Sequence, residues 1–350
     1  MRFSNFLFPE SRSPATDGAI LDEVMQEIRL SEHLNFDAVW LGEHHFDGNC
    51  CYVDPITFSA AVAMATSRIR IGYAVAQTSL HHPIRLAEQL ALIDHLSKGR
   101  LIVGLGRGTN YNVYDYEGFG IDPAEAQARF EEAEDIMLRA WTGEPLDHDG
   151  RFWQLKVPAL RPGCYTRPHP FVIRSASGEA SMVALAKQAR PFLMSVQTNA
   201  VTRQRLSLYR QTMAGAGADE AGIAKVLDQC WAWRNVYVAG TDAEAEAVGI
   251  PAFIAMHEQR AAMRNRIAQE RAVGMGQERP GMGNRIDPAQ GLVCGSPATV
   301  AEQMSELAET GIGGVIITFR LGAMPYEVAS ESIRLFMSKV VPQMARPLAA

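Results

Sequence analysis

The chain has 350 residues, 47% of them hydrophobic, which suffices for the core of one large barrel or of two smaller domains. Its 33 basic and 39 acidic residues give a formal net charge of −6, and no basic block is interleaved with aromatic residues, so we expect neither nucleic acid nor an anionic membrane as a partner. The absence of a signal peptide, a membrane-span-length segment or a CxxC pair among the five cysteines favours a soluble protein of the reducing cytoplasm.

The first half of the chain alternates strand-type apolar runs with stretches of helical periodicity. Strands are expected at residues 2–8, 37–42, 68–76 and 100–106. Helices are expected after them at residues 20–34, 55–66, 83–96 and 122–141. Pro55 and Pro83 in opening turns, and Lys98 with Gly99 at the end of the third helix, support these boundaries. Four βα units therefore precede residue 142.

The second half continues this alternation after a polar insertion at residues 143–169, in which we expect a hairpin that turns at Asp149 and Gly150. Further strands are expected at residues 171–176, 191–196, 234–240 and 313–320, with helices that begin near residues 178, 200, 242 and 325. Eight βα repeats with almost continuously apolar strands predict one α/β domain over residues 1–350, a (β/α)₈ TIM barrel with insertions. An open doubly wound sheet is the alternative.

Residues 271–291 interrupt the alternation, because this stretch is rich in glycine and has no period. A loop of this length in a compact domain is either disordered or a mobile lid over a site. We favour the lid.

In such barrels the chemistry collects where the strands end and the βα loops begin. The strand at 37–42 is followed by Glu43, His44 and His45. Alternate residues that leave a strand point in opposite directions, so only one of the two histidines should face the barrel mouth.

The ends of the fourth and fifth strands predict a phosphate site. The run GLGRG, residues 104–108, removes side chains where a ligand approaches the backbone, and Arg107 within it is a forked cation suited to a phosphate. Ser175 and Ser177, just before a helix, add hydroxyl groups and free N–H groups. The alternative is that the glycines form only a tight turn and that Ser177 is only a helix cap.

A metal-dependent hydrolase is a competing prediction for a barrel with adjacent histidines. Metal ligands on a barrel strand are typically spaced HxH and are joined by His or Asp on later strands. Here the pair is HH, and the later strand ends carry Ser, Gly and Arg, so we expect no metal.

Taken together, several segments make the chain resemble the bacterial luciferase-like flavin monooxygenases over nearly its full length. These segments are WLGEHHF (40–46), HHP (81–83), LIDHLSKGRLIVGLGRG (92–108), PHPFVIRSASGEA (168–180), GSPATVAEQM (295–304) and GGVIITF (313–319). The resemblance implies a TIM barrel that is usually dimeric and that uses reduced FMN (FMNH₂), supplied by a separate flavin reductase, to activate O₂.

The resemblance also implies roles for individual residues. His44 matches the catalytic base that supports the flavin C4a-hydroperoxide, while Ala74 and Val75 match a non-proline cis peptide against the flavin ring. The implied cofactor-binding positions are Ala74, Val75, Gly106, Arg107, Ser175, Ala176, Ser177 and Gly178. Gly106 departs from luciferase, which has a reactive cysteine there, and residues 271–291 match its mobile loop. Glu43 either orients His44 or supports a dimer.

The expected function is an FMNH₂- and O₂-dependent monooxygenase that oxygenates a small apolar aldehyde, ketone or similar molecule. The aromatic residues expected to wall its pocket are Phe8, Phe46, Tyr73, Trp231, Trp233 and Phe319. The alternatives are a deazaflavin (F420)-dependent hydride-transfer enzyme on the same barrel and a non-catalytic partner subunit.

Overall fold

The structure is a computed structural model that describes residues 1–8, 10–11, 13–49, 52–109, 112–176, 178–271 and 285–344, with only the backbone of Arg271. None of the helices in these ranges is long and apolar enough to cross a lipid bilayer.

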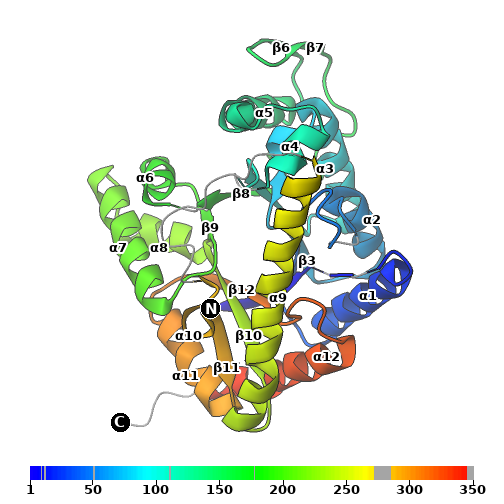
Figure 1. The fold of residues 1–350 in the computed structure, drawn as a ribbon. Helices are drawn as coiled ribbons and strands as arrows, with labels where there is room; N and C mark the ends of the chain where they lie inside the picture. The colour runs from blue at the N-terminus through cyan, green and yellow to red at the C-terminus, as the bar shows by residue number, and fades with distance from the viewer. Residues whose placement is uncertain are drawn as a thin grey trace.

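Parallel strands close into a barrel in the described part of the chain (Figure 1). In order around the ring these are β1 (Arg2–Leu7), β2 (Ala38–Leu41), β3 (Arg70–Tyr73), β5 (Leu101–Gly106), β8 (Phe171–Ala176), β9 (Phe192–Met194), β10 (Trp231–Val238) and β12 (Gly314–Thr318). The ring closes because β12 pairs with both β10 and β1. The predicted eight-stranded barrel is therefore confirmed, and the open sheet is wrong.

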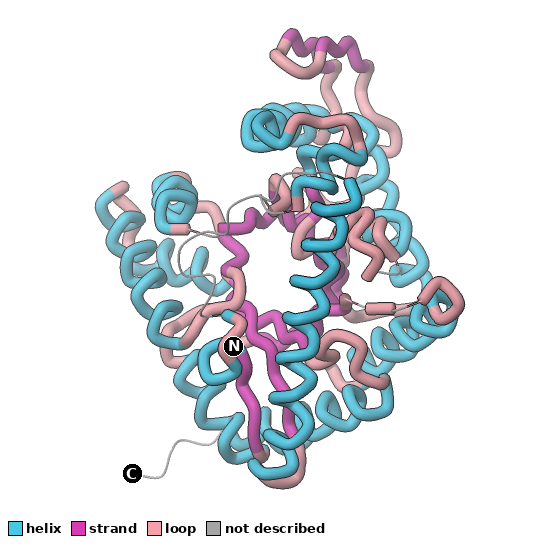
Figure 2. Tube along the Cα trace, in the orientation of Figure 1, coloured by secondary structure: helices cyan, strands magenta, loops and turns pink. Residues whose placement is uncertain are grey.

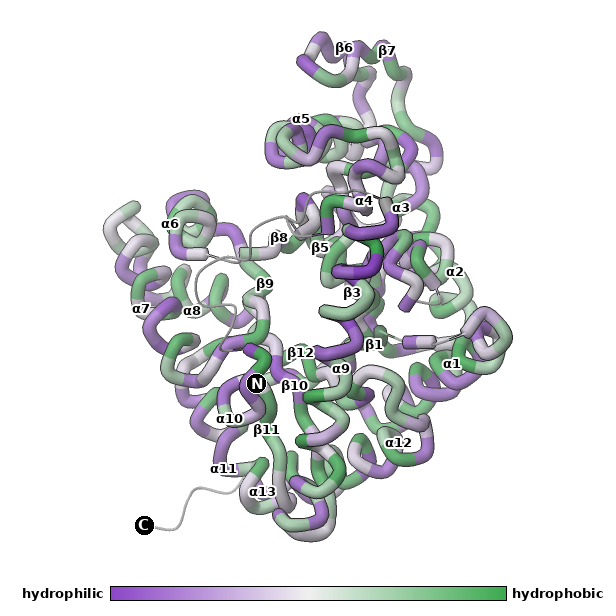
Figure 3. The backbone as a smooth tube through the Cα atoms, in the orientation of Figure 1, coloured by the Kyte–Doolittle hydropathy of each residue, from purple (hydrophilic) through white to green (hydrophobic). Residues whose placement is uncertain are grey.

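Helices surround the ring on its outside (Figures 1 and 2). They include α1 (Asp17–His33), α2 (Pro55–Ala65), α3 (Pro83–Ser97), α5 (Ala126–Ala140), α6 (Glu179–Lys187), α7 (Asn199–Gly215), α11 (Pro297–Ala308) and α12 (Tyr326–Leu335). Helix α9 (Asp242–Arg271) instead runs across the ring (Figure 1). Along several of the helices hydrophobic and hydrophilic residues alternate, as expected for helices with one buried face (Figure 3). The start of α2 shows the local cause, since the Asp54 side chain accepts the N–H groups of Ile56 and Thr57.

Several short elements were not predicted. They are the strands β4 (Ala76–Gln77) and β11 (Leu292–Gly295), the helices α4 (Val113–Gly118), α8 (Glu220–Asp228), α10 (Pro288–Gly291) and α13 (Val341–Met344), and the single turns Thr78–Leu80, Pro123–Glu125 and Phe336–Val340. The strand predicted at 234–240 begins earlier, at Trp231. The predicted lid at 271–291 is not irregular throughout, because Arg271 ends α9 and Pro288–Gly291 is helical. Residues 272–284 of this segment lie outside the described residues.

The predicted hairpin in the insertion is confirmed. Strands β6 (Leu146–Asp149) and β7 (Gln154–Val157) pair antiparallel and project beyond α5 (Figure 1). Glu132 of α5 ties the turn to the body, because its carboxylate accepts the N–H groups of Phe152 and Trp153.

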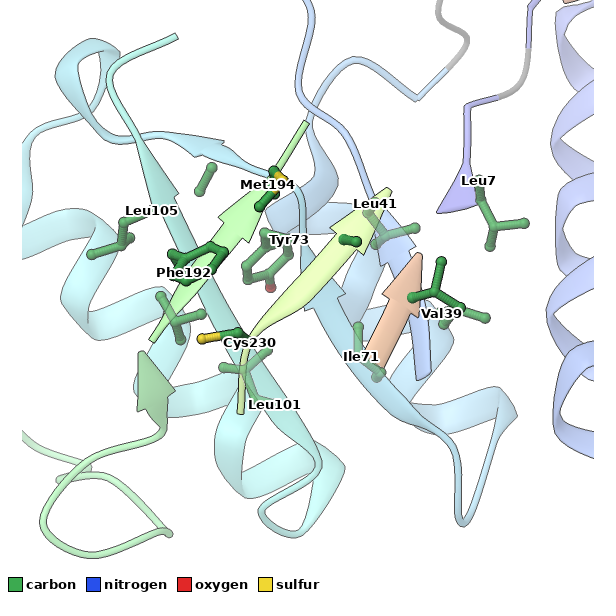
Figure 4. Packing of buried hydrophobic residues seen from close by; sticks show 14 of the residues in the cluster. Leu7, Val39, Leu41, Ile71, Tyr73, Leu101, Leu105, Phe192, Met194 and Cys230 are labelled. Carbon is green, nitrogen blue, oxygen red and sulfur yellow. The ribbon is translucent and has the colours of Figure 1, made fainter. Parts of the chain in front are cut away.

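The core has two layers because the strands are buried on both faces. Along β2, Ala38 and Trp40 belong to the cluster inside the barrel, whereas Val39 and Leu41 pack toward the helices. Figure 4 shows part of the outer layer, where Leu41 and neighbouring side chains lie against the strands. Inside, the rings of Trp40 and Trp231 meet edge to face at 5.4 Å and fill the barrel below its mouth.

Gly104 in β5 permits a close approach between neighbouring backbones. A Cβ atom at this position would lie 1.7 Å from the carbonyl oxygen of Tyr73. A side chain therefore fits only if β5 moves away from β3.

We predict that Gly104→Ala lowers the free energy of unfolding by at least about 3 kcal/mol, because a backbone oxygen cannot rotate out of the way. Urea denaturation of the full chain measures this. Gly215→Ala is the control, because a Cβ there meets nothing within 4 Å, and it should leave stability unchanged or raise it by up to about 1 kcal/mol. Equal stability of the two variants would contradict the prediction.

Candidate active site

His44 faces the mouth of the barrel, just beyond β2. Its ring lies edge-on to Phe8 at 5.2 Å, and Phe8 packs against the cluster inside the barrel. His44 Nδ1 lies 2.9 Å from the side-chain nitrogen of Asn112. Whether the Asn112 amide presents its nitrogen or its oxygen, it forms a hydrogen bond with His44 Nδ1. Nε2 is therefore the ring nitrogen that remains for a ligand. Among the described residues, none hydrogen-bonds to Nε2.

Asp115 of α4 is the carboxylate beside His44. Its Oδ2 lies 3.9 Å from His44 Nδ1 and accepts a hydrogen bond from Gln77, while its Oδ1 accepts the backbone N–H of His45. Burial raises the pKa of Asp115, although the charge of His44 and the bond from Gln77 oppose this. The Asp115 side chain is inaccessible to solvent, so it can act electrostatically on His44 but not on bulk solutes.

Glu43 forms a second buried centre behind His44. One carboxylate oxygen lies 2.9 Å from His45 Nε2 and 2.7 Å from His81 Nε2, and the other accepts the backbone N–H of Gln77 at 2.6 Å. No contact between the carboxylate of Glu43 and His44 exists in the described part of the chain. Glu43 therefore anchors the loop after β2 to the segment after β4, and it affects His44 only through the backbone.

The ion pair between Glu43 and His81 shifts the pKa values of both groups. Burial would raise the pKa of Glu43, but the charge of His81 and the hydrogen bonds from His45 and His81 prevail and lower it to about 2. Burial would lower the pKa of His81, but Glu43 prevails and raises it. The adjacent histidines thus have different environments, as predicted: His44 lies at the mouth and His45 lies in the buried centre.

The cofactor positions expected on three strands converge at one point of the mouth. The Ala74–Val75 peptide bond is cis, as the family resemblance implied. A Cβ at Gly106 would lie 2.5 Å from Val75 Cγ2 and 3.0 Å from Ser175 Oγ, so a side chain at 106 would collide with both. Val75, just before β4, and the ends of β5 and β8 therefore meet at one point of the mouth, here called the cradle, where the backbone of Gly106 carries no side chain.

The remaining expected cofactor positions lie around this cradle. The carbonyl of Arg107 accepts the hydroxyl groups of Ser79 and Tyr116, which fixes the backbone of the glycine-rich loop. Burial raises the pKa of Tyr116 to about 12, against the hydrogen bond with Ser79 and the charge of Arg107. Gly178 is the N-cap of α6. Ala176 is buried in the outer layer, so it can offer a ligand only its backbone, and Ser177 lies outside the described residues.

Three of the aromatic residues expected to wall the pocket lie elsewhere. Tyr73 is fully buried on the outer side of β3, where its hydroxyl meets Ser59. Phe319 packs against Phe36 in the outer layer, and Phe46 is 54% exposed. The sequence shows alternation along these strands, but both faces are apolar, so the inward face could not be identified.

The other three expected residues, Phe8, Trp231 and Trp233, lie inside the barrel or at its mouth. Phe6, which was not predicted, joins two of them. Phe6, Phe8 and Trp233 form a continuous aromatic wall, with ring centroids 6.1 Å apart for Phe6 and Phe8 and 4.2 Å apart for Phe6 and Trp233. Trp231 lies deeper, against Trp40, and closes the floor.

The described residues contain no group of three His, Cys, Asp or Glu side chains arranged to hold a metal ion. The described site offers the imidazole of His44, an aromatic wall and the cradle at Gly106.

Comparisons with known proteins identify the family of the chain. Residues 1–313 match the family described as luciferase-like monooxygenase. Limonene 1,2-monooxygenase of Rhodococcus erythropolis is 29% identical over 248 residues, which cover 70% of this chain and 62% of that enzyme. The oxygenase component of flavin-dependent trigonelline monooxygenase of Acinetobacter baylyi is 30% identical over 171 residues, which cover 49% of this chain and 47% of that protein. The chain thus matches less than two thirds of the length of either relative.

Two solved structures resemble the whole chain. Monooxygenase RslO1 of Streptomyces bottropensis has a TM-score of 0.80 and 28% identity, and the match covers 99% of this chain and 100% of that one. The oxygenating constituent of 3,6-diketocamphane monooxygenase of Pseudomonas putida, solved with FMN, has a TM-score of 0.76 at 18% identity, with 99% of both chains covered. The second match shows a common fold.

We predict that Glu43→Gln lowers the free energy of unfolding by about 3 kcal/mol at pH 5.5, because it leaves His81 without its buried counter-charge. The Glu43 contribution is fully present above the ordinary carboxyl pKa of 4.5 and is lost as the pH falls toward 2. The His81 contribution is fully present below 6.5 and is lost as the pH rises through its raised pKa. Urea midpoints of the two proteins should therefore differ most between pH 4.5 and 6.5. A difference independent of pH would contradict this assignment.

Proposed function

The chain belongs to the luciferase-like monooxygenase family, and we propose that it is the oxygenase component of a two-component system that uses FMNH₂ and O₂ to oxygenate a small, largely apolar organic molecule. The observation that carries the proposal is the cradle, in which Val75 and Ser175 flank the bare backbone of Gly106 at the same barrel mouth as His44. A flat ring system with a phosphate tail fits this arrangement better than a compact substrate alone.

The residues present fit FMN. The phosphate would bind near Arg107, the exposed Ser175 hydroxyl and the first N–H groups of α6, where the helix dipole favours an anion. The ring system would lie against Val75, over the backbone of Gly106. When bound, the reduced flavin supplies the electrons that activate dioxygen.

His44 supplies the proton-handling group of the proposed reaction. Its Nδ1 is occupied by Asn112, so proton uptake and release take place at Nε2, which faces the mouth. Asp115, 3.9 Å from the ring, stabilises the positive charge that the imidazole carries after it takes up a proton. Phe8, part of the aromatic wall with Phe6 and Trp233, lies edge-on against the His44 ring and makes its surroundings partly apolar.

We also propose two partners. A separate flavin reductase would supply the reduced cofactor, and the trigonelline relative, named an oxygenase component, supports this. A second copy of the chain would cover the outer face of α2 and α3, where Met64 is 71% and Leu92 is 51% exposed.

We predict that His44→Ala lowers product formation by a factor of about 100 or more, while reduced FMN binds as tightly as in the wild type, because His44 handles a proton rather than holding the phosphate. Oxygen uptake should continue, with most of the oxygen released as hydrogen peroxide. Anaerobic titration with reduced FMN and a peroxide assay measure both effects for any accepted substrate. His33→Ala, at the exposed end of α1, is the control. Unchanged product yield in His44→Ala would exclude His44 as the acid or base.

We predict that Arg107→Ala weakens FMN binding by a factor of about 10 to 100, the usual effect of losing a charge-assisted hydrogen bond. Riboflavin, which lacks the phosphate, should bind the variant and the wild type equally. Titration of both reduced flavins separates a phosphate contact from a general loss of structure. If the wild type binds F420 but not reduced FMN, F420-dependent hydride transfer replaces the proposed function.

A further inference from the structure

Helix α9 runs across the ring of strands, and its contacts place one of its faces over the mouth (Figures 1 and 2). Near one end of this face, Phe253 packs against Gly291, just before β11. Near the other, the Met263 methyl group lies 2.9 Å from where a Cβ would stand at Gly48, in the loop after β2. Between them, Arg260 binds Glu10, just beyond β1, with two nitrogens at 2.7 and 2.6 Å.

This face brings charge to the aromatic wall of the site. Arg260 places its guanidinium 5.3 Å from the ring centroid of Phe8, the same ring that meets His44. His257 and Arg264 lie three residues before and four residues after Arg260, so all three side chains share one side of the helix. The helix therefore reaches the aromatic wall of the site at Phe8.

His257 is a polar group on this face that the proposed reaction does not use. Its ring lies edge-on to Phe253 at 4.5 Å, and its Nε2 is buried without a hydrogen-bond partner among the described residues. A buried polar atom without a partner is costly, and a bound ligand is a common explanation for one. Burial, together with the charges of Arg260 and Arg264, lowers the pKa of His257 to about 4. The imidazole is thus neutral at pH 7 and can donate an N–H within a cationic environment.

We propose that His257, Arg260 and Arg264 form a recognition site for a carboxylate on the substrate, whose ring lies against the wall of Phe8 and Trp233. A carboxylate would satisfy His257 Nε2, and it would lie on the side of the helix that carries Arg260 and Arg264, where Arg260 also binds Glu10. This inference rests on the proposed function and narrows its substrate to cyclic, largely apolar acids.

The test uses a matched pair of probes, 2-naphthoate and its neutral amide 2-naphthamide, titrated calorimetrically into the full chain at pH 7. We expect the wild type to bind the carboxylate about tenfold more tightly than the amide. His257→Ala should lose about tenfold in affinity for the carboxylate and change little for the amide, whereas His257→Gln, which keeps an N–H donor, should retain most of the preference. His33→Ala is the control variant.

A second measurement distinguishes direct contact from a structural effect. A carboxylate bound at His257 raises the pKa of its imidazole, so binding of 2-naphthoate at pH 5 should take up protons in the wild type but not in His257→Gln. Equal affinity of the two probes for the wild type, no measurable binding of either, or unchanged proton uptake in the variant would overturn the inference. These outcomes do not contradict the proposed function, which is tested separately by the binding of reduced FMN.

Discussion

The structure depends on the alternation of side chains along buried parallel strands. In β2 this alternation sends Ala38 and Trp40 into the barrel and Val39 and Leu41 toward the helices. The same alternation continues past the last paired residue, so that His44 lies at the mouth and Glu43 and His45 point into the protein behind it. Because both faces must be filled, a shift of one residue would bury the imidazole that the site needs and would expose the anchoring carboxylate.

Two buried carboxylates surround His44 without sharing a role. Glu43 binds His45 and His81 and joins two loops, whereas Asp115 lies beside His44 itself. Gln77 bridges the two centres, because its side chain donates both to the Glu43 carbonyl and to Asp115. Buried charges are costly unless they are paired and hydrogen-bonded, and this bridge lets one rigid network position the imidazole from behind.

The strands, the hairpin and the convergence of loops at the mouth could be predicted because their signals are long or repeated. The helix α4 has six residues, too few for a periodic signal, and the positions of Asn112 and Asp115 were missed with it. Tyr73 and Phe319 were assigned to the inside of the barrel but lie in the outer layer. When both faces of a strand are buried, the sequence does not show which apolar residues point inward. The position of His257 depends on how α9 crosses the barrel, and that crossing is set by contacts between segments far apart in the chain, such as Arg260 with Glu10.

The pairing of β10 departs from that of a simple closed ring. This strand pairs with β9 only at Trp231, opposite Leu193, and its later residues pair with β11 instead. Beyond Trp231, β10 no longer pairs with β9. The backbone N–H and C=O groups on this part of β10 are hydrogen-bonded by β11 instead. One side of the barrel wall is thus built from an additional strand near the rim, while Trp40 and Trp231 pack against each other inside the ring.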